Sequence, residues 1–539
     1  MSGKIINHGL DTQAKMIEGV IKTVDAIETT LGPAGRCVAI SNDFGNPEIT
    51  RDGATVAKSV SFSDPIINMG AQLVKTAASR TEDQAGDSTS TCSILIREFC
   101  IRGRRSLTTG RNVYEIKSGM GKAMKWVKEY IVKNSILVDG DFEKIRKVAT
   151  ISANNDPEIG NLVVECMEKV GVNGVITAEL SSGLDTQVDV TTGMKLERGW
   201  VSPQYITSPE DGKCVMENPY ILVVGEKLSS VNQMIGILEG LVKSGRPFLI
   251  VCDDIDDVVN TTLIMNTLQG AIRCCVVKGI DFGDNRKNTM ADIAIAVGAT
   301  YLTPETGKTI KDATIEDLGS AKKVIISRDN TIIYEGFGNP DEVMERAEVI
   351  KARIQDPTTT EYDKTKFEKR LANLAGGIGI IKAGGASEAE KLNLKATIED
   401  SILASKSAIE EGCVPGGGYI YYKASLDVMK DSSFWKGLVG DEEEGAKIVF
   451  SSLPCILKTI AINSGNSGDV VLEYLKKAKP GIGYNAKTKK YGNLLNEGIL
   501  DSAKAIRVAL ENSISAAAMV LLTDCTIIPE SEEKNNNNN

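Results

Sequence analysis

Three short apolar runs in the middle of the chain decide its fold class: Tyr220-Ile-Leu-Val-Val224, Pro247-Phe-Leu-Ile-Val-Cys252 and Cys274-Cys-Val-Val277. Each run has the length of a buried strand and is bounded by polar or turn-forming residues. Amphipathic segments over 229–244 and 256–269 separate the runs. Because strands that alternate with helices of this length are typical of an α/β domain, we expect these runs to form a parallel sheet.

The segments on both sides of this region have helical periodicity. Apolar residues at spacings of three and four predict helices near 11–31, 68–80, 89–102 and 113–133, and then near 389–411, 447–461 and 503–523. Alternation over 37–40 and 48–50 predicts a hairpin with its turn at 42–45. The simplest topology is an α/β domain inserted into a helical one, with Gly193 and Gly376-Gly377 as candidate hinges.

Composition excludes several classes of function. The 539 residues carry a net charge of −10, which argues against a nucleic-acid-binding surface. The single histidine, His8, leaves almost no room for a histidine zinc site or a Ser-His pair. Eleven cysteines without a CxxC pair indicate reduced, mostly buried thiols. No apolar run approaches the ~20 residues of a membrane span, and the N-terminus resembles neither a signal peptide nor a transit peptide.

Three loops could hold a phosphate. They are Thr30-Leu-Gly-Pro-Ala-Gly-Arg36, Ala85-Gly-Asp-Ser-Thr-Ser-Thr91 and Gly412-Cys-Val-Pro-Gly-Gly-Gly418. The second precedes a helix, so its N–H groups and hydroxyls would form an anion site, and Asp87 could coordinate Mg²⁺. Taken singly, each loop is more simply a turn or a helix cap. Binding of a phosphate and Mg²⁺ by these loops together requires that they converge in space.

Two further carboxylates stand out. Asp52 precedes a glycine at a strand end, and Asp400 lies off the apolar stripe of its helix. Either could orient or deprotonate a water molecule for attack on a γ-phosphate. A turn residue and a solvated helix face are the simpler alternatives.

Read together and in order, these loops resemble the group I chaperonins, the folding machines of bacteria and organelles. The resemblance extends from the N-terminus to about Cys525 and is carried by Thr30–Arg36, Ile49–Gly53, Asn68–Gln72, Ala85–Thr91, Thr150–Asn154, Phe282–Asp284, Leu374–Gly377, Glu410–Gly412 with Gly416–Gly418, and Gly483–Asn485. It implies a multidomain fold, partly helical and partly α/β. The implied domains are an equatorial domain (1–135 and 412–526), a small intermediate hinge domain (136–192 and 378–411), an inserted α/β apical domain (193–377) and a disordered tail (527–539).

The resemblance also implies an ATPase that requires Mg²⁺, with K⁺ as a further candidate ion. Asp87 would hold the metal, and Asp52 and Asp400 would position the attacking water, Asp400 arriving when its domain closes. The residues implied to contact ATP are Thr30, Leu31, Gly32, Pro33, Arg51, Asp87, Ser88, Thr89, Ser90, Thr91, Gly417, Asn485, Ala486, Ile499 and Asp501.

An exposed apolar groove would bind non-native client proteins and a co-chaperonin lid. Its implied residues are Trp200, Gln204, Tyr205, Ile235, Leu238, Ile264 and Met265; the alternative is that they belong to an ordinary core. The implied assembly is a homo-oligomer of one or two seven-membered rings, with no nucleic-acid or membrane partner. The implied compartment is the bacterial cytoplasm or an organelle matrix. The cysteine count and the asparagine tail favour an organelle, such as a mitochondrion or a relict mitochondrion whose leader is absent or removed.

Departures from the family pattern keep a second hypothesis open. Ser88 occupies a position that is usually glycine, where a side chain demands a strained backbone. Gln204 and Asn260 replace apolar groove residues. The alternative is therefore a structural ring or holdase with weak or no ATPase activity. A small-molecule ATP-dependent enzyme ranks last, because no catalytic Lys, His or Cys group accompanies the acids.

Overall fold

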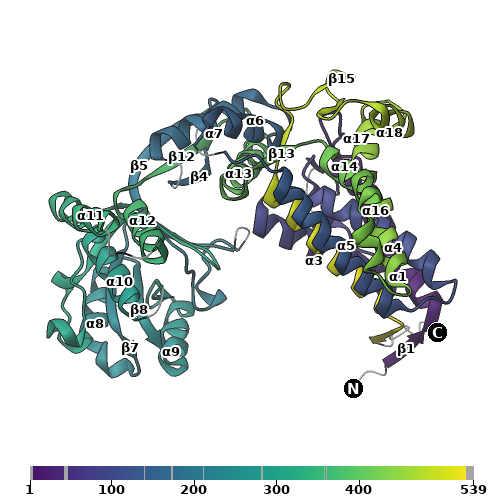
Figure 1. Ribbon diagram of the computed structural model, residues 1–539. Helices are drawn as coiled ribbons and strands as arrows, with labels where there is room; N and C mark the ends of the chain where they lie inside the picture. Colours follow the sequence, from purple (N-terminus) through teal and green to yellow (C-terminus); the bar gives the residue numbers. More distant parts are fainter. Residues whose placement is uncertain are drawn as a thin grey trace. The chain divides into compact units, whose positions relative to one another are not determined.

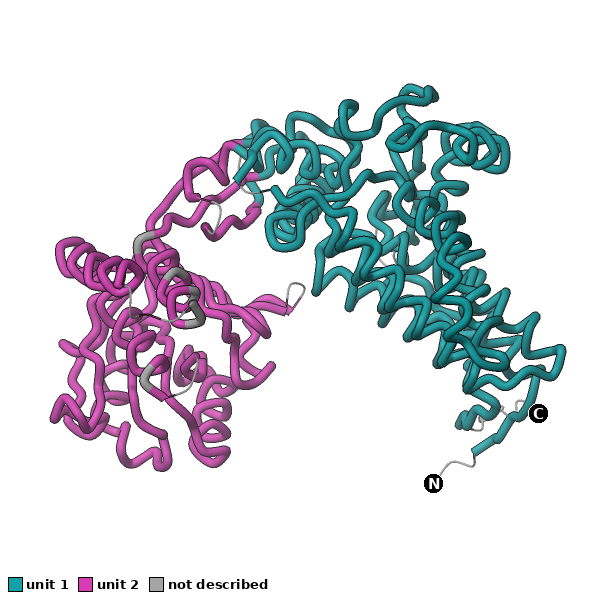
Figure 2. Tube along the Cα trace, in the orientation of Figure 1, with its two compact units in different colours: residues 1–164, 180–186, 383–539 teal, residues 165–179, 187–382 magenta. Residues whose placement is uncertain are grey.

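The structure is a computed structural model that describes residues 4–41, 47–138, 140–171, 174–181, 183–209, 212–280, 283–356, 359 and 361–529. The predicted turn at 42–45, Phe282 and the tail from residue 530 lie outside the described residues. The chain divides into two compact units (Figure 2). Unit 1 comprises residues 1–164, 180–186 and 383–539, and unit 2 comprises residues 165–179 and 187–382.

The first part of unit 1 is helical, as its periodicity predicts (Figure 1). The helix predicted over 11–31 spans Gly9–Glu28, because the chain leaves the helix at two threonines before Gly32-Pro33. Asp64 caps α3 by accepting hydrogen bonds from the N–H groups of Ile66 and Ile67. The helices are α1 (Gly9–Glu28), α2 (Gly53–Ser59), α3 (Pro65–Ala85), α4 (Thr89–Leu107), α5 (Val113–Asn134), α6 (Phe142–Ser152) and α7 (Pro157–Val170), the last of which continues into unit 2.

The C-terminal part of unit 1 returns to helices. The helix predicted over 447–461 is two helices, because Pro454 has no N–H to donate to the preceding turn. The helices are α13 (Glu388–Glu411), α14 (Tyr419–Asp427), α15 (Ser432–Lys436), α16 (Glu442–Ser452), α17 (Cys455–Asn463), α18 (Gly468–Lys477) and α19 (Ala503–Leu522).

Helices from both ends of the chain share one core in unit 1. Helices α1, α3, α4, α5, α16 and α19 pack around fully buried side chains such as Phe99 and Tyr421. Helices α1 and α3 approach closely at two glycines. A Cβ on Gly19 would lie 1.9 Å from the carbonyl oxygen of Ile67, and one on Gly70 would lie 1.9 Å from that of Met16. This contact joins the middle of α1 to the first turns of α3, and the two helices lead into the first two candidate loops.

Two stretches of unit 1 are long and apolar enough to cross a membrane by length and composition alone. They are 442–463 and 503–522, and 67% of each is buried inside the structure. Their apolar side chains belong to the core just described. The eleven cysteines all lie in the described residues, and each is a free thiol, as the sequence predicts.

Among its described residues, unit 1 also contains four two-stranded sheets. The predicted hairpin is present as β2 and β3, in which Val38 pairs with Thr50. The prediction of a disordered tail from residue 527 is wrong for 527–529, which belong to a strand that pairs antiparallel with the N-terminal strand. Local composition cannot reveal a partner that lies more than 500 residues away. The pairs are β1 (Lys4–His8) with β17 (Cys525–Pro529), β2 (Val38–Ile40) with β3 (Glu48–Thr50), β13 (Cys413–Pro415) with β16 (Leu500–Ser502), and β14 (Ile482–Asn485) with β15 (Lys490–Asn493).

Unit 2 is built on a mixed sheet. The three apolar runs form strands that pair in parallel, as predicted, but the strands beyond them pair antiparallel, so the expectation of a parallel sheet holds for one edge only. Among the described residues the strand order is β4-β12-β5-β11-β10-β7-β8-β9, with β6 beside β10. The strands are β4 (Val175–Leu180), β5 (Gln187–Leu196), β6 (Cys214–Glu217), β7 (Tyr220–Leu228), β8 (Phe248–Ile255), β9 (Cys274–Lys278), β10 (Gly319–Ile326), β11 (Thr331–Gly336) and β12 (Gly377–Ala383).

Helices accompany this sheet, and the candidate hinge glycines lie within it. Gly193 pairs with Tyr334, and Gly377 pairs with Thr192, so sheet hydrogen bonding continues through both positions. The division into equatorial, intermediate and apical domains stays a prediction. The helices are α8 (Ile235–Ser244), α9 (Asp257–Leu268), α10 (Gly283–Val297), α11 (Pro340–Gln355) and α12 (Glu361–Ala375).

Candidate functional site

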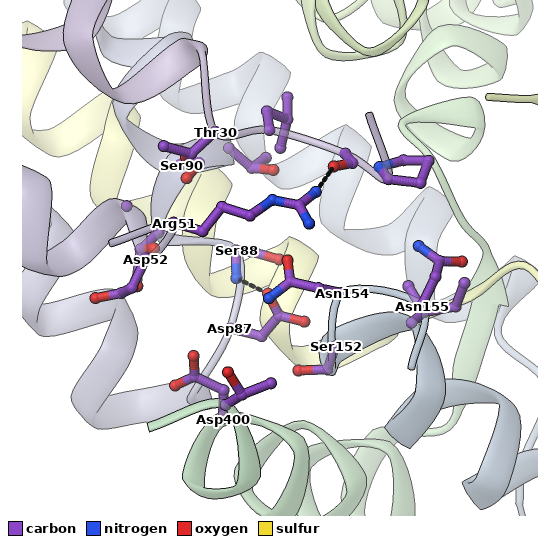
Figure 3. Close-up of a pocket in the computed structure, with 18 of the residues that line it drawn as sticks. Thr30, Arg51, Asp52, Asp87, Ser88, Ser90, Ser152, Asn154, Asn155 and Asp400 are labelled. Atoms are coloured by element: carbon purple, nitrogen blue, oxygen red, sulfur yellow. Dashed lines mark hydrogen bonds between the residues drawn. The ribbon is translucent and has the colours of Figure 1, made fainter. Parts of the chain in front are cut away.

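A cavity of about 530 Å³ opens in unit 1 where the candidate loops meet. It is lined by the turns after α1 and α3, the junction of β3 with α2, the end of α6, helix α13, the turn before α14 and the strands β14 and β16. Figure 3 shows part of this lining. The three loops therefore converge, which is the condition that the sequence alone could not test.

Every residue that the resemblance assigns to the nucleotide, the metal or the attacking water lines this one cavity. Their individual roles stay predictions. The residues are Thr30, Leu31, Gly32, Pro33, Arg51, Asp52, Asp87, Ser88, Thr89, Ser90, Thr91, Asp400, Gly417, Asn485, Ala486, Ile499 and Asp501.

The turn between α3 and α4 presents an acid and a helix N-terminus side by side. Ser88 precedes the first turn of α4 with φ 69°, the left-handed conformation that favours glycine. Its side chain makes no capping hydrogen bond, and its N–H donates to Oδ1 of Asp87. The N–H groups at the start of α4 therefore remain available to an anion in the cavity.

Asp87 is a half-buried carboxyl group, and no cationic side chain among the described residues contributes to its pKa. Burial raises its pKa above the ordinary value, and the charge of Asp52 adds to the shift. The hydrogen bond from Ser88 opposes the shift, and the Ser152 hydroxyl faces the carboxyl without reaching full hydrogen-bond geometry. Figure 3 shows Asp87 between Ser152 and Ser88. A buried acid in this state is stabilised by a cation that binds next to it.

Asp52 caps helix α2. Its Oδ1 accepts a hydrogen bond from Ala54 N at 3.1 Å, and its Oδ2 accepts one from Thr55 N at 2.6 Å. Both bonds fix the orientation of the carboxyl group at the cavity wall. The turn-residue interpretation is therefore correct for the local role of Asp52, and its place on the cavity adds a second role to be tested.

Asp400 enters the cavity from α13. Burial is the largest cause that raises its pKa well above the ordinary value, followed by the charges of Asp52 and Asp87. It is therefore not a solvated helix face, as the simpler alternative supposed. The charge of Asp52 thus raises the pKa of both Asp87 and Asp400, and three acids that line one cavity form a site of negative potential.

Arg51 is the cationic side chain among the residues that line the cavity. Its Nη2 donates to the carbonyl oxygen of Gly32 at 2.7 Å, which ties β3 to the loop after α1. Its Nε is buried and has no hydrogen-bond partner. A guanidinium with a free buried N–H is suited to a phosphate oxygen.

The opposite end of the cavity is shaped by glycines around Asp501. Gly417 N donates to Oδ2 of Asp501 at 3.0 Å, and Gly417 has φ 65°. A Cβ on the neighbouring Gly416 would lie 2.5 Å from Oδ1 of Asp501, so only glycine fits there. Burial raises the pKa of Asp501 to about 7, with a contribution from Asp87. This acid is therefore suited to polar groups such as sugar hydroxyls.

The Asn485 side chain is already engaged. Its Oδ1 accepts hydrogen bonds from the N–H groups of Lys487 and Thr488, and its Nδ2 donates to Glu497 at 2.6 Å. Its amide therefore holds the turn after β14.

The lining fits a divalent cation that is shared with phosphate groups. Within the described part of the chain, no group of three His, Cys, Asp or Glu side chains is placed to hold a metal by itself. Mg²⁺ commonly takes one or two carboxylates and completes its shell with water and phosphate oxygens. One unpaired acid, Asp87, next to an anion-binding helix N-terminus fits this pattern.

Sequence reasoning did not assign several residues that also line the cavity. Asn154 and Asn155 have φ of 56° and 65° at the end of α6. The stretch Thr150–Asn154 carried part of the resemblance, so a signal existed for this segment, but none existed for Asn393. The additional lining residues include Glu82, Ile151, Ser152, Asn154, Asn155, Asn393 and Thr397.

The residues assigned to the client groove divide into exposed and buried sets. Ile235 on α8 and Met265 on α9 are 45% and 51% exposed, whereas Trp200, Leu238 and Ile264 are half-buried against the core of unit 2. Tyr205 is only 1% exposed, so its expected place on an exposed groove is wrong.

Tyr205 packs in the core of unit 2, and its hydroxyl has a hydrogen-bond partner there. Its hydroxyl donates to Oδ1 of Asn260 on α9 at 2.8 Å. The polar residue at 260, noted as a departure from the family pattern, thus satisfies the buried phenol. Gln204, next to it, is exposed.

Comparisons with known proteins agree with this architecture. Residues 24–531 match the TCP-1/cpn60 chaperonin family. Among solved structures, the chain is similar to the chaperonin gp146 from the bacteriophage EL 2 (Pseudomonas aeruginosa), which was crystallised in the presence of ATP-BeFx. The two share 21% sequence identity and a TM-score of 0.74, over 98% of this chain and 100% of that chain. The predicted fold class, helical with an inserted α/β part, is confirmed, and the chain belongs to the TCP-1/cpn60 chaperonin family.

Proposed function

We propose that the protein is the subunit of an ATP-hydrolysing chaperonin of the group I type. The observation that carries this proposal is the cavity of unit 1, where Asp52, Asp87 and Asp400 surround the N-terminus of α4. The phage chaperonin of similar fold was crystallised with an ATP analogue, which supports a nucleotide in this family. In this proposal the chain encloses non-native proteins in a ring of seven subunits, in one or two layers, under a co-chaperonin lid.

Each acid has a distinct part in the proposed reaction. Asp87 would hold Mg²⁺, which neutralises charge on the phosphates when bound. The carboxylate of Asp52 is held in place by hydrogen bonds from the N–H groups of Ala54 and Thr55, so it would orient the attacking water. Asp400, whose raised pKa favours the protonated form until positive charge enters the cavity, would then accept the proton of that water. The start of α4 and Arg51 would stabilise the charge of the phosphates.

The rest of the cavity would hold the nucleoside. Asp501 would accept hydrogen bonds from the ribose, the glycine turn 416–418 would pass beneath it, and Ile499 and Ala486 would border the base. K⁺ is a candidate for a second ion. The bacterial cytoplasm and an organelle matrix are both compatible with this activity, with an organelle favoured by the composition.

The exposed side chains of Ile235 and Met265 in unit 2 would form part of a surface that binds clients. Exposed apolar side chains on α8 and α9 would gain about 25 cal/mol per Å² of apolar area that a client covers. Tyr205 takes no part in this surface, because its ring is buried.

The decisive experiment measures phosphate release from ATP by the purified full-length protein with and without Mg²⁺. We expect slow, Mg²⁺-dependent hydrolysis that Asp400→Ala reduces to a small residual rate while nucleotide binding persists. Hydrolysis no greater than that of the Asp400→Ala variant would refute the ATPase. A second candidate function, a holdase ring, is favoured by the left-handed backbone at Ser88; it predicts suppression of client aggregation without turnover.

A further inference from the structure

Asn393, Asp400 and Ser407 share one face of helix α13. They lie seven residues apart, which is just under two helical turns, so each is rotated by only about 20° from the one before. Asp400 lines the cavity from the middle of this face. The residues on either side of it each donate a hydrogen bond to another segment of the cavity wall.

The C-terminal hydrogen bond reaches the turn that carries Asp87. Ser407 Oγ donates to the carbonyl oxygen of Ala85 at 3.0 Å, and the bond is buried. Ala85 is the last residue of α3, so its carbonyl has no partner within its own helix. A Cβ on the following Gly86 would lie 1.9 Å from Cβ of Leu403, so α13 also rests directly on this turn.

The N-terminal hydrogen bond reaches the strand that leads to Asp52. Asn393 Nδ2 donates to the carbonyl oxygen of Ile49 at 3.2 Å, at a more exposed position. Ile49 lies in β3, three residues before Asp52. The two bonds therefore connect α13 to the segments that carry the other two acids, one on each side of Asp400.

Other buried serines of α13 do not make such a connection. Ser405 Oγ donates to Ser401 O at 2.7 Å, within the helix itself. Ser401 Oγ donates to Ala149 O of α6 at 2.9 Å. Ser405 is thus a matched comparison for Ser407, because both hydroxyls are buried on the same helix and only one of them reaches the Asp87 turn.

We propose that Asn393 and Ser407 are positioning residues that hold the carboxyl of Asp400 in register with Asp52 and Asp87. This inference rests on the proposed function. The reaction requires the water between these acids to be aligned with the phosphate, and small displacements of a catalytic group are costly to rate. Ser407 is not among the residues that line the cavity, so loss of its hydrogen bond should alter turnover and leave nucleotide affinity unchanged. Asn393 does line the cavity, so Ser407 is the cleaner of the two tests.

The test compares Ser407→Ala with Ser405→Ala in the full-length protein. We expect Ser407→Ala to lower kcat for ATP hydrolysis about three- to tenfold with KM and nucleotide affinity unchanged, since one hydrogen bond typically contributes a factor of this size. Ser405→Ala should keep kcat within twofold of the unsubstituted protein. Asn393→Ala should give a smaller decrease because its bond is more exposed, and Asn393→Gln, which retains the donor, should recover part of it.

A double-substitution cycle separates positioning from general damage. In an Asp400→Ala background, Ser407→Ala should cause no further loss of the residual rate. An equal loss in both backgrounds, or equal kcat for the Ser405 and Ser407 variants, would overturn the inference. Amide hydrogen exchange over 393–411 gives a readout without turnover: we expect faster exchange in Ser407→Ala than in Ser405→Ala, and equal rates would also overturn it.

Failure of the proposed function has a different signature. If the unsubstituted protein shows no Mg²⁺-dependent hydrolysis, the ATPase is refuted, and the inferred role in turnover is overturned with it. If the unsubstituted protein hydrolyses ATP and the two serine variants behave alike, only the positioning role is overturned.

Discussion

The carboxyl groups of Asp87 and Asp400 face the same cavity, and the charge of Asp87 contributes to the raised pKa of Asp400. One acid comes from the turn between α3 and α4, and the other comes from α13, more than 300 residues later. A cavity that brings two buried acids together is destabilised by their repulsion, and a bound cation relieves it. Removing the charge of each acid in turn therefore separates the roles of Asp87 and Asp400.

Asp87→Asn should remove the effect of Mg²⁺ on nucleotide binding. Asparagine has the size of aspartate but lacks the charge that holds a divalent cation, so we expect at least a tenfold loss of affinity for a non-hydrolysable ATP analogue in Mg²⁺. Calorimetric titration with and without Mg²⁺ measures this loss. Asp400→Asn is the control and should retain the Mg²⁺ effect; an unchanged Mg²⁺ dependence in Asp87→Asn would show that another group holds the metal.

Ser88→Gly should stabilise the protein while hydrolysis changes little. Ser88 has φ 69°, and glycine adopts this conformation without the steric cost that a side chain incurs, roughly 1 kcal/mol. We expect a higher melting temperature of unit 1 and a kcat within twofold of the unsubstituted protein. A rise in kcat of tenfold or more would instead favour the holdase hypothesis, in which the serine suppresses turnover.

Gly86→Ala should displace α13 and depress hydrolysis. The new Cβ would lie 1.9 Å from Cβ of Leu403, at a residue that also has φ 68°. Gly110→Ala is a matched control, because Gly110 has φ 83° and no atom within 4 Å of a Cβ built there. Both variants should lose about 1 kcal/mol of stability from the backbone.

The two glycine variants should therefore differ in activity. Only Gly86→Ala should lower kcat, by roughly tenfold or more, since it alone moves the helix that carries Asp400. Steady-state kinetics together with thermal unfolding distinguish the two variants. Similar kcat values in both would indicate that α13 tolerates the displacement.

Asp317 should make the stability of unit 2 dependent on acid pH. This carboxyl is 4% exposed; burial alone would raise its pKa, but Lys308 and hydrogen bonds from Thr314 lower it to about 2. Because the folded-state pKa lies below the unfolded value near 3.9, the stabilisation is present above pH ~4 and is lost as the pH falls toward 2. The shift corresponds to about 2 kcal/mol.

Asp317→Asn should therefore destabilise the protein by about 2 kcal/mol at pH 7 and by progressively less below pH 4. Denaturant unfolding followed by far-ultraviolet circular dichroism at several pH values measures the difference. A difference that stays constant between pH 7 and pH 3 would show that the ionised state of Asp317 is not its cause.

Local signals were sufficient for the long helices of unit 1, which are α1, α3, α4, α5, α13 and α19. The hydroxyl-rich stretch before residue 92 predicted the start of α4 at Thr89, and α13 and α19 begin within one residue of their predicted positions. Such boundaries depend on capping groups and on periodicity, which are properties of neighbouring residues. The helix predicted over 447–461 is divided at Pro454, and the proline is itself a local signal for this break.

Contacts between distant residues required the tertiary structure. The hydroxyl of Tyr205 is satisfied by Asn260, and the strand at 525–529 pairs with the strand at 4–8. In unit 2, β5 pairs antiparallel with β11 and β12, which lie far along the chain. A short stretch of sequence does not identify these partners, because they come together only when the chain folds.

The helical and α/β segments, the family resemblance and the candidate acids could be recognised in the amino-acid sequence, because periodicity, capping and motif order depend on residues that are close together in the chain. The fold was needed to show that Asp52, Asp87, Asp400 and Asp501 line one cavity. It was also needed to show that Asn393 and Ser407 bond to the segments that carry Asp52 and Asp87. The physical reason is that repulsion among acids and hydrogen bonds between separate segments depend on distance in space, which close packing of α13 against α3 and α6 sets.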